Sequence, residues 1–441
     1  MKRKPPSPED ALKILDERIL VTGKKLVIAV EKSKGLVLFD AWHEREFIDF
    51  FSADGFQPLT YNHPRLREKD FIERFLRAAT IRLPIDQIYT TEYAHLVKSL
   101  SRFALGDKFN RLAFAENQSG AVECALKAAF DWKSQKQIRR GKETKNLSVV
   151  SLAGAYHGSS GYALSLSALP SSRIDGFYPL FDFPKIPCPK LSFPVTDNVE
   201  KATEKSEMEA INRLKNLLKD TSRTVAGVIV EPIQGRGGDN YFRKEFFEKL
   251  YELSRNDDFL LIFDETLTGF GTTGKRWLFE HFEVQPDIAI FGGKAAMAGI
   301  AASERLDEVE SVFNVPGRLN LDLNLCLATL LYSAEVIEAI EEENLIELTK
   351  VRGDELLSRL VSLAEKSPYT SNPRALGALG AIDFTEPRIR EKIVNALFEE
   401  GLIVAESGDR TLAIRLPLDA KSVEMHRGLD ILESVVSGFS E

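Results

Sequence analysis

Three short segments with reactive side chains each follow an apolar run of the kind that forms a buried strand. They are Lys294, after Ile288–Phe291 and a Gly-Gly pair; Asp264, directly after Phe259–Phe263; and Tyr156-His157-Gly158, after the run that ends at Leu152. In open α/β sheets, ligands bind beyond the carboxyl ends of the strands. We therefore expect the three segments to meet at one edge of a sheet and to form a binding site there.

A lysine, a carboxylate and an aromatic ring together suit pyridoxal 5′-phosphate (PLP). The amine of Lys294 would form a Schiff base with the PLP aldehyde, and Asp264 would keep the pyridine nitrogen protonated. Tyr156 would stack on the pyridine ring, and the freed lysine amine would move a proton during the reaction. Each segment alone is also compatible with a strand-end cap, an exposed loop or a turn, so the prediction depends on their occurring together.

Four apolar runs predict the sheet that would position these residues. The runs are Ser148–Leu152, Val225–Val230, Phe259–Phe263 and Ile288–Phe291. They lack the polar alternation of a half-solvated strand, which is typical of parallel strands buried on both faces. Amphipathic helices are expected between them, one beginning near Ser119 and another over Glu245–Asn256. This βαβ alternation predicts a largely parallel sheet.

The character of the sequence changes after Leu325. The expected elements are helices to about Glu343 and over Leu345–Glu365, strands over Ala375–Phe384, Ile403–Glu406 and Thr411–Leu416, and a last helix over Val423–Ser437. This pattern predicts a smaller α+β domain, which two early strands, Leu26–Val30 and Gly35–Asp40, would join. We divide the chain into an N-terminal segment (1–75), a large PLP-binding domain (76–325) and a C-terminal small domain (326–441).

Length and composition exclude several classes of protein. A chain of 441 residues suggests two lobes. No apolar stretch is long enough to span a bilayer, and no secretory signal follows the basic N-terminus. The three cysteines are far apart and form no metal-ligand pattern, so we expect a cytoplasmic protein without a metal site. A net charge of −8 without a basic block argues against nucleic acid as a partner.

Several stretches resemble those of class III aminotransferases, and most of all the lysine 6-aminotransferases, over nearly the whole chain. The stretches are Ala121–Trp132, Gly154–Gly158, Ser160–Leu166, Val230–Gly235, Leu261–Glu265, Pro286-Asp287 and Arg305–Val309. The resemblance implies an α/β protein of the PLP-dependent transferase fold type I. Its large domain would hold a mainly parallel, seven-stranded type of sheet, and two copies would form a homodimer with shared active sites.

The resemblance also implies roles for individual residues. Lys294 would carry the Schiff base, Asp264 would partner the pyridine nitrogen and Tyr156 would be the stacking ring. The remaining matches are Gln118 and Ser119 at the phosphate, before a helix N-terminus that favours anions, Arg415 as the arginine that binds a substrate carboxylate, and Glu231 as an acidic residue that lines the site.

Other positions depart from the family pattern. Leu267 replaces a glutamine that bonds the phenolic oxygen of the cofactor, and leucine cannot donate that bond. Asp322 stands at a threonine that reaches the partner subunit's PLP phosphate, where a carboxylate would be repelled. Ser159 stands where lysine aminotransferases have an arginine on the substrate carboxylate.

Arg236 replaces a glutamate that pairs with the arginine matched by Arg415. Two arginines near each other would repel unless a dicarboxylate or Glu231 lay between them. One hypothesis is that Arg236 takes over carboxylate binding from the arginine lost at Ser159. The alternative is that Arg236 points to solvent.

The sequence therefore predicts a PLP-dependent aminotransferase. It would transfer an ω-amino group, with the lysine ε-amine favoured, to the 2-oxo acid 2-oxoglutarate. An alternative is a diverged class III paralogue with weakened PLP binding and another reaction, such as racemisation, or little catalysis. A third is an unrelated α/β binding protein. The altered pocket positions leave the amino donor open.

Overall fold

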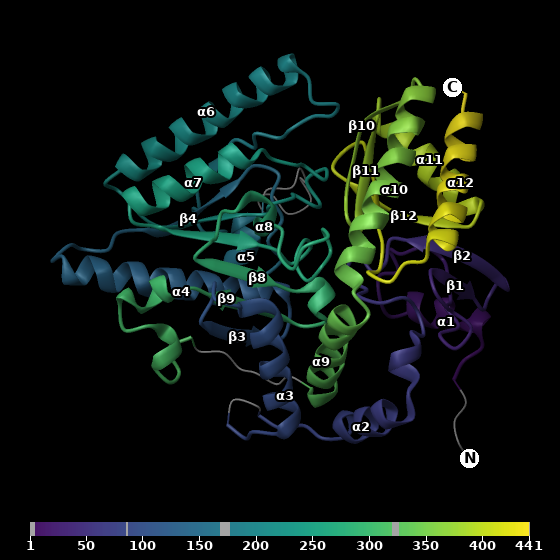
Figure 1. Cartoon of the computed structure of the whole chain (residues 1–441), viewed down its shortest axis with the longest axis horizontal. Helices are drawn as coiled ribbons and strands as arrows, with labels where there is room; N and C mark the ends of the chain where they lie inside the picture. Colours follow the sequence, from purple (N-terminus) through teal and green to yellow (C-terminus); the bar gives the residue numbers. More distant parts are fainter. Residues whose placement is uncertain (1–4, 85–86, 168–176, 320–325, 441) are drawn as a thin grey trace.

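The computed structural model describes residues 5–84, 87–167, 177–319 and 326–440, and it contains two β-sheets with helices packed around them (Figure 1). Within these residues, no helix is both long enough and apolar enough to cross a membrane. The same residues contain no group of three or more His, Cys, Asp or Glu side chains that could hold a metal ion.

The larger sheet has seven strands in the order β3-β9-β8-β7-β6-β4-β5. The strands are β3 (Arg111–Ala115), β4 (Leu147–Leu152), β5 (Lys185–Ile186), β6 (Thr224–Val230), β7 (Leu260–Asp264), β8 (Ile288–Phe291) and β9 (Ala298–Ala302). Strands β4 to β8 are parallel, and only β9 runs antiparallel to both of its neighbours. The mainly parallel sheet predicted from the apolar runs is therefore confirmed.

Helices cover both faces of this sheet. On β6, Val228 and Val230 face a core shared with α6 (Asp197–Lys219) and α7 (Lys244–Asn256), whereas Ile229 faces a core shared with α4 (Gln118–Arg139). Successive side chains of a strand point to opposite faces, so a strand that is buried on both faces must be apolar throughout. This is the physical reason for the unbroken apolar runs.

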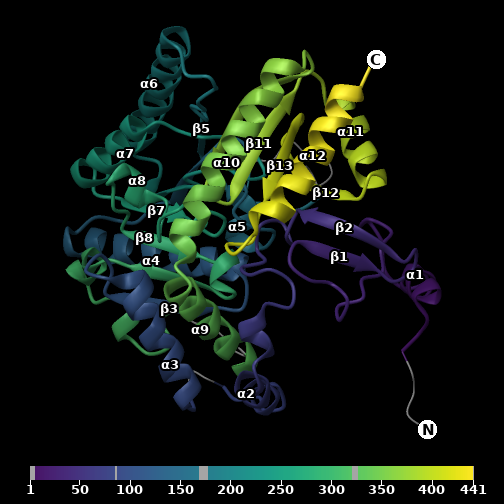
Figure 2. The ribbon, with the colours of Figure 1, turned by 45° about the vertical axis from the view of Figure 1, so that its right-hand side comes forward.

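The second sheet has six strands in the order β1-β2-β12-β13-β11-β10. They are β1 (Val37–Asp40), β2 (Arg45–Phe50), β10 (Thr370–Leu376), β11 (Leu379–Phe384), β12 (Leu402–Ser407) and β13 (Thr411–Arg415). Strand β2, which was not among the expected strands, pairs in parallel with β12, and so the N-terminal segment joins the C-terminal sheet. Figure 2 shows these early strands beside the C-terminal ones.

Two predictions about this sheet were wrong. Leu26–Val30 forms no strand, because only Ile28 pairs, through an isolated bridge to Asp40. The expected single strand Ala375–Phe384 is a hairpin that turns at Gly377. That glycine has φ +60°, and a Cβ there would lie 2.3 Å from the Thr272 carbonyl oxygen, so the close approach to the larger sheet's loop requires a glycine.

The first two helices after residue 326 belong to different cores. Helix α9 (Leu327–Glu342) packs in the core of the larger sheet, whereas α10 (Leu345–Lys366) packs with α11 (Pro387–Glu399) and α12 (Ser422–Gly438) on the six-stranded sheet (Figure 2). The change of core thus falls between α9 and α10. The other helices are α1 (Pro8–Asp16), α2 (Lys69–Ala79), α3 (Thr91–Leu100), α5 (Gly161–Leu166) and α8 (Phe279–Phe282).

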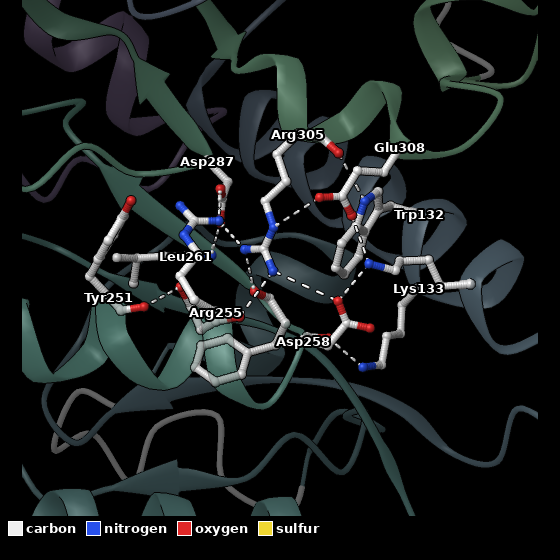
Figure 3. A network of polar contacts seen from close by, with 12 residues as sticks. Trp132, Lys133, Tyr251, Arg255, Asp258, Leu261, Asp287, Arg305 and Glu308 are labelled. Carbon is white, nitrogen blue, oxygen red and sulfur yellow. Dashed lines mark hydrogen bonds and ion pairs between the residues drawn. The ribbon is translucent and has the colours of Figure 1, made fainter. Parts of the chain in front are cut away.

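Asp287 directly precedes β8, at the end opposite Lys294. Figure 3 shows Asp287 with its partners. Its buried carboxylate pairs with Arg255 at 2.7 Å and with Arg305 at 2.9 Å, and it accepts the Leu261 backbone N–H at 2.8 Å. The contact with Leu261 ties β8 to β7, while the two guanidinium groups come from α7 and from the turn after β9. These contacts therefore fix the position of α7 relative to β7 and β8.

We expect Asp287→Asn to lower the free energy of unfolding by about 3 kcal/mol, because Arg255 would lose its counter-charge and Arg305 would lose the nearest of its three acidic partners. Urea unfolding followed by circular dichroism measures this change. The control is Glu283→Gln, whose pair with Lys244 is exposed, so that its loss should change the stability far less. Equal unfolding midpoints for the two variants would contradict the anchoring role.

Candidate active site

A cavity of about 360 Å³ opens at the carboxyl edge of the seven-stranded sheet, as predicted. It is lined by segments that follow β4, β6 and β7, by the start of α4, and by the loop after β2 and strands β12 and β13 of the other sheet. The predicted site residues on its wall are Gln118, Ser119, Tyr156, Glu231, Arg236, Asp264 and Arg415. The cavity is therefore shared between the two sheets.

Lys294 lies just behind this wall. It follows β8 in a 3₁₀ turn, Gly293–Ala295, and its side chain is buried. The Nζ atom donates to the carbonyl of Gln57 at 2.5 Å and to the carbonyl of Leu416 at 2.9 Å. The chain neighbours of these two residues, Phe56 and Arg415, line the cavity. The lysine amine must turn away from the two carbonyls to react with a group in the cavity.

Burial lowers the pKa of Lys294 to about 7. The negative charges of Asp419 and Asp49 oppose this shift, and the positive charge of Arg415 adds to it. An amine with such a pKa is half neutral near pH 7, and the neutral amine is the form that attacks an aldehyde.

Asp264 ends β7 and is held by two contacts. One carboxylate oxygen lies 2.8 Å from Nδ1 of His157, and the other accepts the Thr266 backbone N–H at 3.2 Å. His157 is buried, and its Nε2 atom has no partner among the described residues. The sequence placed His157 beside Tyr156 but assigned it no role; the geometry makes it the residue that orients Asp264.

The first turn of α4 forms a cradle suited to a phosphate. Gln118 and Ser119 occupy this turn, where backbone N–H groups lack helical partners and the helix dipole favours an anion. The Ser119 hydroxyl accepts the Ser159 backbone N–H at 3.1 Å. A Cβ at Gly158 would lie 2.4 Å from that hydroxyl, so only glycine leaves the cradle open. With Asp264 and Lys294 nearby, the residues present fit PLP.

Arg415 has its own counter-ion, which the sequence analysis missed. The carboxylate of Asp239 contacts its guanidinium at 2.7 Å and 2.9 Å, and both side chains are buried. Burial raises the pKa of Asp239, and the positive charges of Arg415 and Arg374 oppose that shift. The Nε atom of Arg415 is buried without a partner among the described residues, so the guanidinium keeps a donor for a carboxylate.

Arg236 stands at the outer side of the cavity and is paired as well. Its Nη2 lies 3.0 Å and its Nε 3.2 Å from one carboxylate oxygen of Asp54, and its guanidinium lies 4.1 Å from the centre of the Tyr156 ring. The side chain is half exposed, yet it lines the cavity. The expected repulsion between Arg236 and Arg415 is thus avoided by Asp54 and Asp239, and not by Glu231.

Glu231 has a structural contact on each carboxylate oxygen. It accepts the backbone N–H groups of Tyr156 at 2.8 Å and of Gly235 at 3.3 Å, and so joins the loops after β4 and β6. Burial, and then the nearby charge of Asp264, raise the pKa of Glu231 well above its usual value. The side chain borders the cavity, but most of its bonding capacity is used within the protein.

The departures from the family pattern lie at this same cavity. Leu267 and Ser159 both line it. The Leu267 side chain fills the space beside Gly235 and Gly55, at each of which an added Cβ would lie within 3.0 Å of it. It therefore adds an apolar wall where a polar one was expected. Asp322 lies outside the described residues.

The seven-stranded sheet with helices on both faces and the cavity at its carboxyl edge define a PLP-dependent transferase of fold type I. Residues 20–436 match the family Aminotransferase class-III. The chain belongs to the class III aminotransferases, and it is a PLP-dependent transaminase.

The similar proteins with curated names include L-lysine-epsilon aminotransferases. The one from Mycobacterium tuberculosis is 34% identical over 98% of this chain and 96% of its own length, and the one from Streptomyces clavuligerus is 32% identical over 98% and 95%. A solved structure, the lysine aminotransferase from M. tuberculosis in the internal aldimine form, matches with a TM-score of 0.94 at 33% identity over 98% of this chain and 99% of that one.

We expect the rate at which Lys294 reacts with PLP to rise steeply between pH 6 and 8 and to level off above pH 8, because the lowered pKa makes the amine neutral there. The rate is measured by absorbance after adding PLP to the cofactor-free protein, and borohydride reduction with peptide mass spectrometry locates the modified lysine. An ordinary lysine, with a pKa of about 10.4, would still be gaining reactivity above pH 9. A midpoint in that range would show that burial does not control the amine.

Proposed function

We propose that the protein transfers the ε-amino group of lysine to 2-oxoglutarate. The carrying observation is the cavity that joins Asp264, the α4 cradle and two arginines in front of a buried lysine of lowered pKa. The L-lysine-epsilon aminotransferases, at 32–34% identity, support lysine as the donor over 4-aminobutyrate, whose aminotransferases are 27–29% identical. No finding favours the alternative of a diverged paralogue with little catalysis.

PLP, when bound, supplies an aldehyde for the amine and an electron-withdrawing ring. In this proposal Lys294 would hold the cofactor through its amine, and the freed neutral amine would move a proton. Asp264, oriented by His157, would keep the ring nitrogen charged. Tyr156 would cover the ring, and Gln118 and Ser119 would bind the phosphate through the first turn of α4.

The substrate side of the cavity must bind lysine in one half of the reaction and 2-oxoglutarate in the other. Arg415 is buried, and its Nε has no partner within the described part of the chain, so we assign Arg415 to the carboxylate next to the reacting carbon of 2-oxoglutarate. Lysine has no carboxylate next to its ε-carbon. Asp239 then serves as the counter-ion that neutralises Arg415 while lysine is bound.

The PLP-loaded enzyme should form glutamate when lysine and 2-oxoglutarate are both present, as measured by chromatography of the products. Lys294→Ala should lower kcat by about 10³-fold or more, because the proton-transfer group is lost. Asp264→Asn, which keeps the shape but not the charge, is the matched comparison. If ornithine or 4-aminobutyrate reacts well and lysine does not, the assignment of the donor is wrong.

We also propose a cytoplasmic homodimer with shared active sites. In its support, Phe177, Tyr178 and Phe181 form an aromatic surface segment with more than half of each residue exposed. Exposed aromatic side chains in one segment are typical of protein interfaces. Sedimentation at about twice the chain mass of 49.4 kDa is the expected result, and a species of single-chain mass would refute the dimer.

A further inference from the structure

Three charged side chains lie between the candidate active-site cavity and a second cavity outside it. The outer cavity has a volume of about 690 Å³ and is bordered by the segment around Lys24 and by strand β12 and the turn after it. The residues that line both cavities are Asp54, Arg236 and Glu406. A substrate that extends from the inner cavity towards the outer one would therefore place its far end near these three charges.

At this junction of the two cavities, the contacts of Arg236 allow it to exchange Asp54 for another carboxylate. Two of its nitrogens contact the same oxygen of Asp54, and the guanidinium plane is supported by the Tyr156 ring. Both charged side chains remain partly exposed, at 48% for Arg236 and 29% for Asp54. An ion pair in contact with water contributes little net stability, so a substrate carboxylate can replace Asp54 at low cost.

The backbone at both residues is fixed, although their pairing is not. The carbonyl of Arg236 accepts the Gly408 N–H at 2.9 Å, which ties it to the other sheet. Asp54 lies in a run of positive φ angles from Ser52 to Gly55, and Asp49 holds this run by accepting the N–H groups of Phe51 and Ser52. Such backbone is costly and persists where surrounding contacts hold it.

Glu406 does not compete for Arg236, because it has its own cation. Its carboxylate lies 3.2 Å from Nη1 of Arg390. The junction therefore offers one cation and one anion that can separate from each other, Arg236 and Asp54. A zwitterionic amino-acid head carries the complementary pair of charges.

We propose that Arg236 and Asp54 recognise the α-amino-acid head of the donor. Arg236 binds the α-carboxylate and Asp54, released from its ion pair, binds the α-ammonium group. This inference rests on the proposed function, since it takes an ω-amine at the reacting end. It makes Arg236 a specificity-determining residue at the outer side of the cavity, where it also contacts Tyr156.

A series of three donors tests the two contacts separately. Lysine has both head charges, 6-aminohexanoate has only the carboxylate, and cadaverine has only the ammonium group. Arg236→Gln should raise KM about 10- to 100-fold for lysine and for 6-aminohexanoate, because a charged hydrogen bond is lost. The KM for cadaverine should change by less than about 3-fold. Asp54→Asn should raise the KM for lysine and for cadaverine and leave the KM for 6-aminohexanoate unchanged.

Binding without reaction provides the second readout. Hexanoate has the carboxylate and no amine, so its Kd for the PLP-loaded enzyme, measured by calorimetry, reports carboxylate recognition alone. This Kd should rise in Arg236→Gln, and it should rise less in Arg236→Lys, because lysine keeps the positive charge. The control is Lys24→Ala, which removes a cation that borders only the outer cavity and should leave all values unchanged.

Equal effects of Arg236→Gln on lysine and cadaverine, or an unchanged Kd for hexanoate, would overturn the proposal. Circular dichroism and retention of PLP show that each variant is folded. Failure of the donor assignment is separable from this outcome. If the unaltered enzyme uses 6-aminohexanoate and cadaverine but not lysine, the proposed donor is wrong, and the 6-aminohexanoate comparison still decides the role of Arg236.

Discussion

The buried amine of Lys294 is the constraint on which the site depends. A lysine amine in a protein interior must be hydrogen-bonded, and here both acceptors come from the other sheet: Gln57 follows β2 and Leu416 follows β13. The two lobes must therefore be docked for Lys294 to be satisfied. The same burial lowers its pKa to about 7, so one packing arrangement both closes the fold and makes the amine reactive.

The charges around the cavity are arranged in local pairs. Arg415 has Asp239, Arg236 has Asp54 and Glu406 has Arg390. This pairing explains how the chain accommodates an arginine at position 236 in the same cavity as Arg415. A new charge at a cavity is tolerated when a nearby loop supplies its counter-charge, and the strained loop at Asp54 does so.

Much of the larger sheet was predictable because parallel strands covered on both faces are apolar throughout. Strand β9, Ala298–Ala302, was not predicted, since alanine and glycine have low strand propensity and only pairing with β8 and β3 makes this segment extended. Helix α11 was missed although Pro387 at its start and the spacing of Ile389, Ile393 and Leu397 indicate it.

The sequence by itself determined that Asp264, Tyr156 and Lys294 follow buried strands and therefore share one edge, because apolar runs that alternate with helices give parallel strands. Only the tertiary structure decided which charges meet. Asp54 and Asp239 come from loops whose partners lie 182 and 176 residues away, and no local pattern marks them. The orientation of Lys294 was likewise set by carbonyls of the other sheet, since any backbone carbonyl can accept a hydrogen bond and only the docking of the lobes chooses between them.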